Sequence, residues 1–422
     1  MDIRYYIQGG QALRGDVHIS GSKNAVLPLI AGSLLCNGET VLHNVPDLRD
    51  VRSLLEVLEF LGAETSFQEG TIRIRTHSVQ SKLIPTEYVG KLRGSIVLLG
   101  PMLARFGVVE MAYPGGCVLG KRSVHAHIDA LTQLGAEDTS TNEVLHLQGA
   151  LKPGIIILPE FSVTATENAI LAAAILPGET RIELAAAEPH VQDVCRLVQA
   201  MGAEVEGIGT HTLMIRGTPH LRCVEHTVIT DYLEAGALTV AALVTGGKVR
   251  IHGAEETHLI SFLKTISSMG GIWKYDDKEK ILFVDGELSS LLPATVQTNI
   301  FPGFPTDLLP PMGVIMTQAK GVSRVFERLY EGRMAYLYEM EKMGAHIEVL
   351  NAHQALIIGP CILRGRTVAS NDIRAGAAMV LAGLCAEGET IVTDVRYIER
   401  GYDRLHEKLQ KLGAKIERVE VE

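Results

Sequence analysis

The sequence predicts an α/β protein built from six copies of one folding unit. Two glycine patterns recur about every 70 residues along the 422-residue chain, and a fixed period of this kind is typical of repeat architectures. The first pattern is a hydrophobic residue followed by glycine and a small residue. It stands at Leu61–Ala63, Leu134–Ala136, Met201–Ala203, Met269–Gly271, Met343–Ala345 and Leu412–Ala414. The second is a single glycine that precedes an expected strand, at Gly38, Gly107, Gly178, Gly247, Gly321 and Gly388.

Each repeat shows the same order of expected elements. An almost wholly apolar helix comes first, as in residues 24–35 and 165–176, and apolar residues on every side of a helix indicate burial all round. A glycine turn and a β-rich strand such as 390–395 follow. An amphipathic helix such as 51–60 then ends at the glycine of the first pattern, which suits a left-handed cap. Alternating strands such as 71–75 close the repeat, so we expect helices buried among sheets.

The length of the chain predicts two domains. A chain of 422 residues exceeds the size at which a single hydrophobic core stops growing. Three repeats in each domain is the simplest division of six. The boundary is therefore expected near residues 227–231, between the third and fourth repeats.

Composition and charge exclude several classes of protein. The formal net charge of −10 argues against a nucleic-acid partner, because such proteins are usually basic. The first residues lack a basic segment followed by an apolar run, and the apolar stretches are too short to span a membrane. The six cysteines, at positions 36, 117, 195, 223, 361 and 385, form no CxxC pair. We therefore expect reduced thiols in a cytoplasmic protein, with no metal site, no cofactor and no membrane partner.

The repeat also indicates where a functional site lies. One residue stands just before each apolar helix, and the six are Lys23, Arg93, Thr164, Tyr232, Asp307 and Arg374. Starts of the second helices add Arg49, Arg122, Arg333 and Arg400. Helix starts present free N–H groups and the positive end of the helix dipole, so several that converge would bind an anion. Each residue alone could be a cap or a solvated charge, but the recurrence at one phase of the repeat favours a site.

Two residues stand out in this set. Asp307 is the only acid in it, which suggests a base or a group that orients a hydroxyl, although a helix cap is the simpler alternative. Cys117 lies in a Pro-Gly-Gly loop in the one repeat that is a few residues longer than the rest, and Lys121 and Arg122 flank it. Neighbouring cations lower the pKa of a thiol and make it reactive. An incidental surface thiol is the alternative for Cys117.

Six motifs closely resemble those of the UDP-N-acetylglucosamine 1-carboxyvinyltransferase family. They run in the family's order from end to end of the chain, at Gly21–Asn24, Leu92–Ser95, Pro114–Arg122, Gly303–Asp307, Asp372–Gly376 and Glu399–Tyr402. The resemblance implies a two-domain inside-out α/β barrel, the enolpyruvyl transferase fold, with six βαβαββ repeats and three in each domain. It also implies that the first residues join the C-terminal half. The expected domains are residues 22–229, and residues 1–21 plus 230–422.

The resemblance implies a reaction and a role for each matching residue. The enolpyruvyl group of phosphoenolpyruvate would pass to the 3′-hydroxyl of UDP-N-acetylglucosamine with release of phosphate, the first committed step of peptidoglycan precursor synthesis. Cys117 would protonate the methylene carbon and Asp307 would take the sugar proton, and Lys23 and Arg400 complete the catalytic set. Phosphoenolpyruvate would bind Lys23, Arg93, Arg122, Arg374 and Arg400. The UDP-sugar would bind Asn24, Arg93, Arg122, Ser123, Val124, His125, Ala126, Ser162, Val163, Thr164, Asp307 and Leu329.

Several positions depart from the family pattern and mark the chain as a divergent paralogue. Ser123–His125 replaces Pro-Val-Asp, Glu160 replaces a lysine, and Tyr232 replaces an arginine. These changes lie on the nucleotide-sugar side, whereas the phosphoenolpyruvate set is intact. The acceptor is therefore less firmly indicated than the reaction type.

Three alternatives remain open. An enolpyruvyl transferase for another acceptor, such as the shikimate-phosphate member of the superfamily, would share the fold but would lack the Gly-Gly-Cys loop. A regulatory paralogue would bind the UDP-sugar with little turnover, against which the intact acid, base and anion clamp argue. RNA-end chemistry on a similar repeat fold is disfavoured by the acidic balance of the chain.

Overall fold

The computed structural model describes residues 2–115 and 124–421, and it confirms the predicted α/β fold of repeated units. The described residues form two compact units. The N-terminal unit consists of residues 21–115 and 124–229, and the C-terminal unit of residues 2–20 and 230–421. Among the described residues, the chain passes from one unit to the other after Ser20 and after Ile229. No helix among the described residues is long and apolar enough to cross a membrane.

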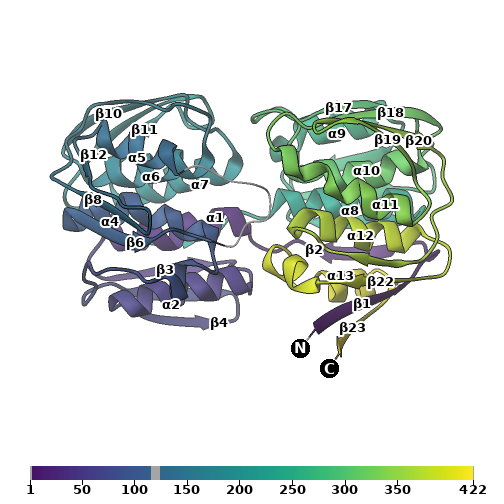
Figure 1. The fold of residues 1–422 in the computed structure, drawn as a ribbon, viewed down its shortest axis with the longest axis horizontal. Helices are drawn as coiled ribbons and strands as arrows, with labels where there is room; N and C mark the ends of the chain where they lie inside the picture. Colours follow the sequence, from purple (N-terminus) through teal and green to yellow (C-terminus); the bar gives the residue numbers. More distant parts are fainter. Residues whose placement is uncertain (1, 116–123, 422) are drawn as a thin grey trace. The chain divides into compact units, whose positions relative to one another are not determined.

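The N-terminal unit contains three sheets (Figure 1). In strand order they are β13(Glu225–Thr227), β3(Glu39–His43), β5(Thr71–Arg75) and β4(Glu64–Gln68); β6(Val108–Ala112), β8(Val144–Gln148) and β7(Glu137–Asp138); and β11(Glu204–Glu206), β12(Thr212–Gly217), β10(Gly178–Glu183) and β9(Ile155–Ile157). The pairs β13–β3 and β9–β10 are parallel and the others are antiparallel. The helices are α1(Lys23–Gly32), α2(Arg49–Leu61), α3(Thr86–Val89), α4(Leu99–Phe106), α5(His125–Thr132), α6(Val163–Ile175) and α7(Pro189–Met201).

The C-terminal unit repeats this plan, and the N-terminal strands of the chain complete two of its sheets (Figure 1). The sheets are β15(Ile272–Asp276), β16(Ile281–Asp285), β14(Lys248–His252) and β2(Arg14–His18); β17(Thr295–Gln297), β18(Gly321–Phe326), β20(Gln354–Gly359) and β19(His346–Asn351); and β21(Thr367–Ala369), β22(Glu389–Thr393), β1(Asp2–Gln8) and β23(Lys415–Val421). The helices are α8(Tyr232–Val244), α9(Ile260–Ser268), α10(Leu309–Gln318), α11(Tyr336–Lys342), α12(Ile373–Cys385) and α13(Leu405–Lys411).

The apolar helices predicted from the sequence form the centre of each unit. In α8 every residue from Tyr232 to Leu243 is buried, and in α12 every residue from Arg374 to Leu384. The α8, α10 and α12 helices pack against one another in the C-terminal unit, and α6 contacts both α4 and α5 in the N-terminal unit. Amphipathic helices pack one face inward, and α2 ends at Gly62 in the left-handed conformation, with a φ of 106°. The core therefore consists of helices enclosed by sheets.

The way these helices begin determines where polar groups stand. Four of them have a side-chain cap, because Ser22, Ser162, Asp231 and Asp372 accept hydrogen bonds from backbone N–H groups of the first turn. The α4 and α10 helices are instead preceded by 3₁₀ turns, η2(Arg93–Leu98) and η4(Thr306–Leu308). Each helix start therefore carries a polar residue beside an apolar interior.

The expectation that all cysteines are reduced is wrong for two of them. Cys36 and Cys223 form a disulfide across 187 residues of sequence. Cys36 precedes β3 and Cys223 precedes β13, and these two strands are parallel neighbours, so the residues before them come together. A side chain on Gly38 would stand 2.9 Å from the sulfur of Cys223, which explains the glycine at this turn. Spacing along the sequence could not reveal a pairing made by the sheet.

Candidate active site

The structure places most of the described site residues at the starts of helices, but Arg400, expected to begin a helix, ends a 3₁₀ turn, and Leu329 lies outside the helices. Lys23 and Asn24 are the first residues of α1, Arg93 opens η2, and Ser162 caps α6, which begins with Val163 and Thr164. In the C-terminal unit Asp307 lies in η4 before α10, Arg374 is the second residue of α12, and Arg400 ends η6(Val395–Arg400). Cys117, Arg122 and Ser123 lie outside the described residues.

Lys23 is held by a buried acid. Its Nζ atom lies 2.8 Å from Oδ2 of Asp50, and the two side chains are 12% and 3% exposed. Asp50 stands in the first turn of α2, where the helix dipole favours a negative charge. The ion pair fixes the ammonium group at the start of α1 without covering it completely.

A second group in the N-terminal unit joins η2, α5 and α6. Nε2 of His127 lies 3.2 Å from Oγ1 of Thr164, and Nδ1 of His127 lies 2.9 Å from Nδ2 of Asn168. Burial, reinforced by the nearby charge of Arg93, lowers the pKa of His127 to about 3. His127 is therefore neutral at physiological pH, and it lies near the charge of Arg93 and in contact with the hydroxyl of Thr164.

The predicted residues of α5 begin that helix. Val124 precedes it, and His125 and Ala126 form its first turn, with Ala126 buried. These positions follow directly on the predicted Arg122 and Ser123. Glu160, the acid that departs from the family pattern, is exposed, so water screens its charge.

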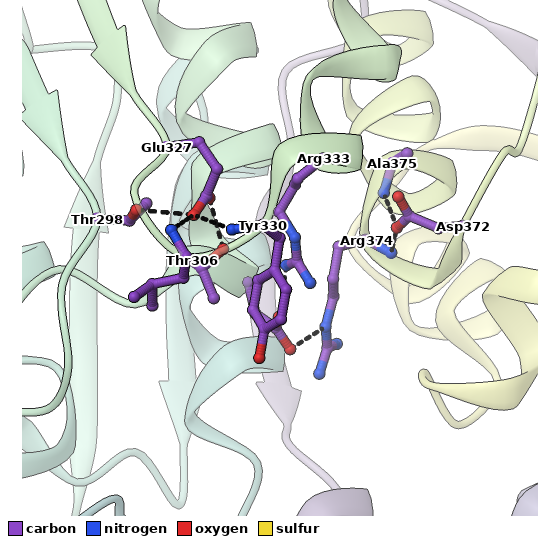
Figure 2. Close-up of polar contacts among 10 residues, drawn as sticks. Thr298, Thr306, Glu327, Tyr330, Arg333, Asp372, Arg374 and Ala375 are labelled. Atoms are coloured by element: carbon purple, nitrogen blue, oxygen red, sulfur yellow. Dashed lines mark hydrogen bonds and ion pairs between the residues drawn. The ribbon is translucent and has the colours of Figure 1, made fainter. Parts of the chain in front are cut away.

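Asp307 is the centre of the polar cluster in the C-terminal unit. Its Oδ1 atom accepts a hydrogen bond from Nη1 of Arg333, and its Oδ2 atom lies 3.0 Å from Nε of Arg374. Arg333 and Arg374 thus reach the same carboxylate, and Figure 2 shows their side chains extending from neighbouring elements. Their side chains are 3% and 5% exposed, whereas that of Asp307 is 23% exposed. The carboxylate is thus the part of the cluster that water reaches.

The two arginines set the charge of this carboxylate. Burial alone would raise the pKa of Asp307, but the guanidinium groups of Arg333 and Arg374 outweigh it and hold this pKa well below the usual range of an aspartate. Within the described chain, Nη1 of Arg374 and Nε of Arg333 make no hydrogen bond. Two charged donors therefore stand beside a carboxylate that is ionised at physiological pH, which is an arrangement suited to binding an anion next to a base.

Tyr402 and Asp372 position Arg374. The guanidinium carbon of Arg374 lies 5.0 Å from the centre of the Tyr402 ring, within cation–π range. Asp372 accepts hydrogen bonds from the backbone N–H groups of Arg374 and Ala375 at 2.7 and 2.9 Å (Figure 2). The start of α12 therefore presents Arg374 in one orientation.

Glu327 organises the segment that contains Leu329. It accepts hydrogen bonds from the hydroxyls of Thr298 and Thr306, at 2.9 and 2.6 Å, and from the backbone N–H groups of Leu329 and Tyr330 (Figure 2). The carboxylate is 0% exposed, and Leu329 is 41% exposed. Glu327 therefore ties this segment to the residue that precedes Asp307, and leaves Leu329 accessible.

Sequence reasoning missed several of these residues and underrated one. Asp50 and His127 directly follow Arg49 and Ala126 in the first turns of α2 and α5, whereas Asn168 and Glu327 lie four and two positions from Thr164 and Leu329. None of the four occupies the position just before an apolar helix that the repeat highlights. Arg333 was recognised as a helix start but received no role. Burial of a charged or polar side chain would have marked them, and burial is visible only in the fold.

The chain is similar over its whole length to proteins of one enzymatic class. The family model described as EPSP synthase (3-phosphoshikimate 1-carboxyvinyltransferase) matches residues 7–409. A UDP-N-acetylglucosamine 1-carboxyvinyltransferase of Chlorobium luteolum is 42% identical over 416 residues, covering 98% of this chain and 97% of that protein. One of the same name from Magnetococcus marinus is 39% identical over 415 residues, covering 98% of each.

Solved structures show the same fold. The enolpyruvyl transferase NikO from Streptomyces tendae superimposes with a TM-score of 0.90 over the full length of both chains, at 24% identity. An EPSP synthase from Acinetobacter baumannii gives a TM-score of 0.75 at 19% identity, again over both full chains. At these identities the likeness concerns the fold, which is the α/β fold of enolpyruvyl transferases.

Proposed function

The chain belongs to the family of UDP-N-acetylglucosamine 1-carboxyvinyltransferases, and from this premise we propose that it transfers the enolpyruvyl group of phosphoenolpyruvate to the 3′-hydroxyl of UDP-N-acetylglucosamine, releasing phosphate. This reaction would be the first committed step of peptidoglycan precursor synthesis. Phosphoenolpyruvate and the nucleotide sugar are the proposed partners, and the cytoplasm, where phosphoenolpyruvate is made, is the proposed location. The observation that carries the proposal is the placement of Asp307 between Arg333 and Arg374.

The proposed anion clamp consists of the cations at the helix starts. Lys23, Arg93, Arg122, Arg374 and Arg400 would bind the phosphate and carboxylate of phosphoenolpyruvate. Arg374 supports this role best, because its buried Nη1 atom makes no hydrogen bond within the described chain and a guanidinium matches the geometry of an oxyanion. Arg333, which received no role from the sequence, joins the proposed clamp on the same grounds.

Asp307 is the proposed base for the sugar hydroxyl. A carboxylate whose pKa is far below normal is a weak base, so the two arginines present an obstacle to this role. An anionic substrate bound to Arg374 would offset part of the positive charge that Asp307 experiences, and the pKa of Asp307 would rise. On this account the bound phosphoenolpyruvate itself makes Asp307 a stronger base, which couples deprotonation of the acceptor to the presence of the donor.

Cys117 is the proposed general acid. Its thiol would give a proton to the methylene carbon of phosphoenolpyruvate, and the oxygen of the sugar would bond to the adjacent carbon while Asp307 takes the hydroxyl proton. Loss of a proton from the new methyl group and departure of phosphate would then restore the double bond in the product. Fixed cations stabilise the charge on the phosphate throughout these steps.

The proposed nucleotide-sugar site contains Asn24, Arg93, the segment 122–126, Ser162, Val163, Thr164, Asp307 and Leu329. Ser162, Val163 and Thr164 stand at the start of α6, where a helix of 13 residues offers free N–H groups to a diphosphate. The exposure of Glu160 supports this choice of acceptor, because a solvated acid repels a nearby diphosphate only weakly.

Phosphate release tests this proposal. The protein is mixed with phosphoenolpyruvate and either UDP-N-acetylglucosamine or shikimate 3-phosphate, and inorganic phosphate is measured over time. Release with the nucleotide sugar alone is the expected result. Phosphate release only with shikimate 3-phosphate would show that the enzyme uses another acceptor. Binding of the nucleotide sugar without any phosphate release would indicate a regulatory paralogue.

A further inference from the structure

We propose that His127 and Asn168 fix the hydroxyl group of Thr164 as a hydrogen-bond donor to the diphosphate of the bound nucleotide sugar. His127 and Asn168 are then positioning residues, and Thr164 makes the contact. This inference rests on the function proposed above. The family pattern has a lysine at position 160, where this chain has Glu160, and the hydroxyl of Thr164 would supply a contact to the diphosphate in this chain.

The direction of every hydrogen bond in this group follows from one backbone contact. The N–H of Gly100 lies 2.6 Å from Oδ1 of Asn168 and can only donate, so the oxygen of the amide must face it. The amide nitrogen, which can only donate, then faces Nδ1 of His127 and the carbonyl oxygen of Ile96, at 2.9 Å from each, and the carbonyl oxygen of Thr164 at 3.2 Å. Nδ1 of His127 must therefore be an acceptor, which places the ring proton on Nε2.

The protonation state of His127 determines the hydrogen-bonding role of the Thr164 hydroxyl. Its pKa of about 3, caused by burial and by Arg93, keeps the ring neutral, with one N–H group. That group is Nε2–H, which points at Oγ1 of Thr164 at 3.2 Å and donates to it. The hydroxyl oxygen of Thr164 is thus an acceptor toward His127, and its own hydrogen must point elsewhere. No acceptor for that hydrogen occurs within the part of the chain that the structure describes.

The group is rigid as well as ordered. His127 and Asn168 are 3% and 0% exposed. A side chain on Gly100 would stand 2.2 Å from the carbonyl oxygen of Asn168, so only glycine lets α4 approach α6 closely enough for the backbone contact. Thr164, by contrast, is half-buried at the second position of α6, beside the cap residue Ser162. A buried framework therefore presents one hydroxyl donor at the surface of a helix start.

The chemistry of the position favours a phosphate oxygen as the acceptor. Thr164 stands where the α6 dipole and free N–H groups favour an anion, and the charge of Arg93 reaches His127 next to it. A fixed neutral donor adds to these groups without an additional charge, and it offsets the loss of a cation at position 160.

The test compares two substitutions of similar size at this exposed end of the group. Thr164→Val removes the hydroxyl and keeps the shape, whereas Thr164→Ser keeps the hydroxyl. Calorimetry measures the dissociation constants of UDP-N-acetylglucosamine, UDP and uridine. We expect Thr164→Val to weaken binding of UDP and of the nucleotide sugar roughly tenfold, the effect of losing one hydrogen bond to a charged group, and to leave uridine binding and the KM for phosphoenolpyruvate unchanged. Thr164→Ser should bind like the unaltered protein.

A double-mutant cycle separates positioning from general structural damage. In the protein that retains Thr164, His127→Phe should weaken UDP binding. In the Thr164→Val variant, the same substitution should have little further effect on UDP binding, because the histidine acts through the hydroxyl. Equal losses in both backgrounds would remove His127 from the positioning role. If His127→Phe does not fold, the UDP affinities of Thr164→Val and Thr164→Ser still show whether the hydroxyl contacts the diphosphate.

The outcomes distinguish this inference from the proposed function. Equal UDP affinity in Thr164→Val and the unaltered protein, with phosphate release intact, would overturn the inference and leave the function standing. Failure of the unaltered protein to bind the nucleotide sugar would overturn both. Loss of uridine binding in Thr164→Val would contradict the assignment to the diphosphate.

Discussion

Lys23 and Asp50 form an ion pair of 2.8 Å from which water is largely excluded, at the start of α1 in the N-terminal unit. In the proposed reaction Lys23 binds phosphoenolpyruvate, and Asp50 keeps the ammonium group in place. Asp50→Asn removes the charge and keeps the shape, so the lysine loses its fixed position. We expect the KM for phosphoenolpyruvate to rise by about tenfold, with the dissociation constant of UDP-N-acetylglucosamine unchanged, measured by steady-state kinetics and calorimetry.

Asp47 provides the matched control. It lies three positions earlier in sequence and pairs with Arg52, and both of these side chains are well exposed, at 37% and 56%. Exposed pairs contribute little, so Asp47→Asn should leave both constants unchanged. Equal effects of the two substitutions would show that the Lys23 pair has no special role.

The pairing of Asp307 with Arg333 and Arg374 also makes a prediction about stability. Asp307→Asn leaves two buried guanidinium groups without their counterion, so the free energy of unfolding at pH 7 should fall by about 3 kcal/mol. Chemical denaturation of the two proteins measures this difference. Asp16→Asn is the control, because Asp16 pairs with Arg250 and His252 on an exposed sheet face and its loss should cost under about 1 kcal/mol.

The pH dependence of the same difference tests its electrostatic origin. The pKa of Asp307 is depressed in the folded protein, so its contribution is complete above the pKa of an unfolded aspartate, about 3.9. It is lost only as the pH falls below that value toward the folded pKa. The stability difference between Asp307→Asn and the unaltered protein should therefore be constant from about pH 5 to 8 and shrink below about pH 4. A difference that changes between pH 6 and 8 would contradict this origin.

The different environments of the cysteines predict which of them an alkylating reagent modifies first. Burial raises the pKa of Cys195 and of Cys385 to about 12, and Cys36 and Cys223 are joined in a disulfide. These four sulfurs should be inert to iodoacetamide at pH 7.5, whereas Cys117, flanked in sequence by glycine and cations, should react. Peptide mapping by mass spectrometry should find alkylation at Cys117 first, and phosphoenolpyruvate should slow it. Faster modification of any of the other four would overturn the proposed reactivity.

The sequence predicted the fold well because the fold is repetitive. Six glycine patterns and six apolar helices carry the same signal in each repeat, and burial of whole helices such as α8 leaves no polar face to obscure it. The same repetition located Lys23, Arg93, Thr164, Asp307 and Arg374 at helix starts.

What the sequence did not predict are contacts made by residues distant along the chain. Arg333 and Arg374 meet at Asp307 only because α10, α11 and α12 are neighbours, and His127 reaches Thr164 only because α5 packs on α6. The Cys36–Cys223 bond depends on parallel pairing of β3 with β13. Such pairs have no local pattern, since their spacing is set by the fold and not by a helix or strand period.

The disulfide leads to a prediction about the N-terminal unit. Closing a loop of 187 residues removes chain entropy from the unfolded state, which corresponds to about 5 kcal/mol in the simplest loop model. Non-reducing peptide mapping of air-oxidised protein should recover Cys36 linked to Cys223, and reduction should lower the melting temperature. Cys36→Ser should melt like the reduced protein and show no further change with reductant.

The identity of the reaction product tests the central claim most directly. The protein is incubated with phosphoenolpyruvate and UDP-N-acetylglucosamine, and the nucleotide sugar is then isolated and examined by mass spectrometry and NMR. The account predicts an enolpyruvyl ether on the 3′ oxygen of the sugar, formed in equal amount to the phosphate released. Recovery of unmodified UDP-N-acetylglucosamine, or of an enolpyruvyl group on any other atom, would contradict it.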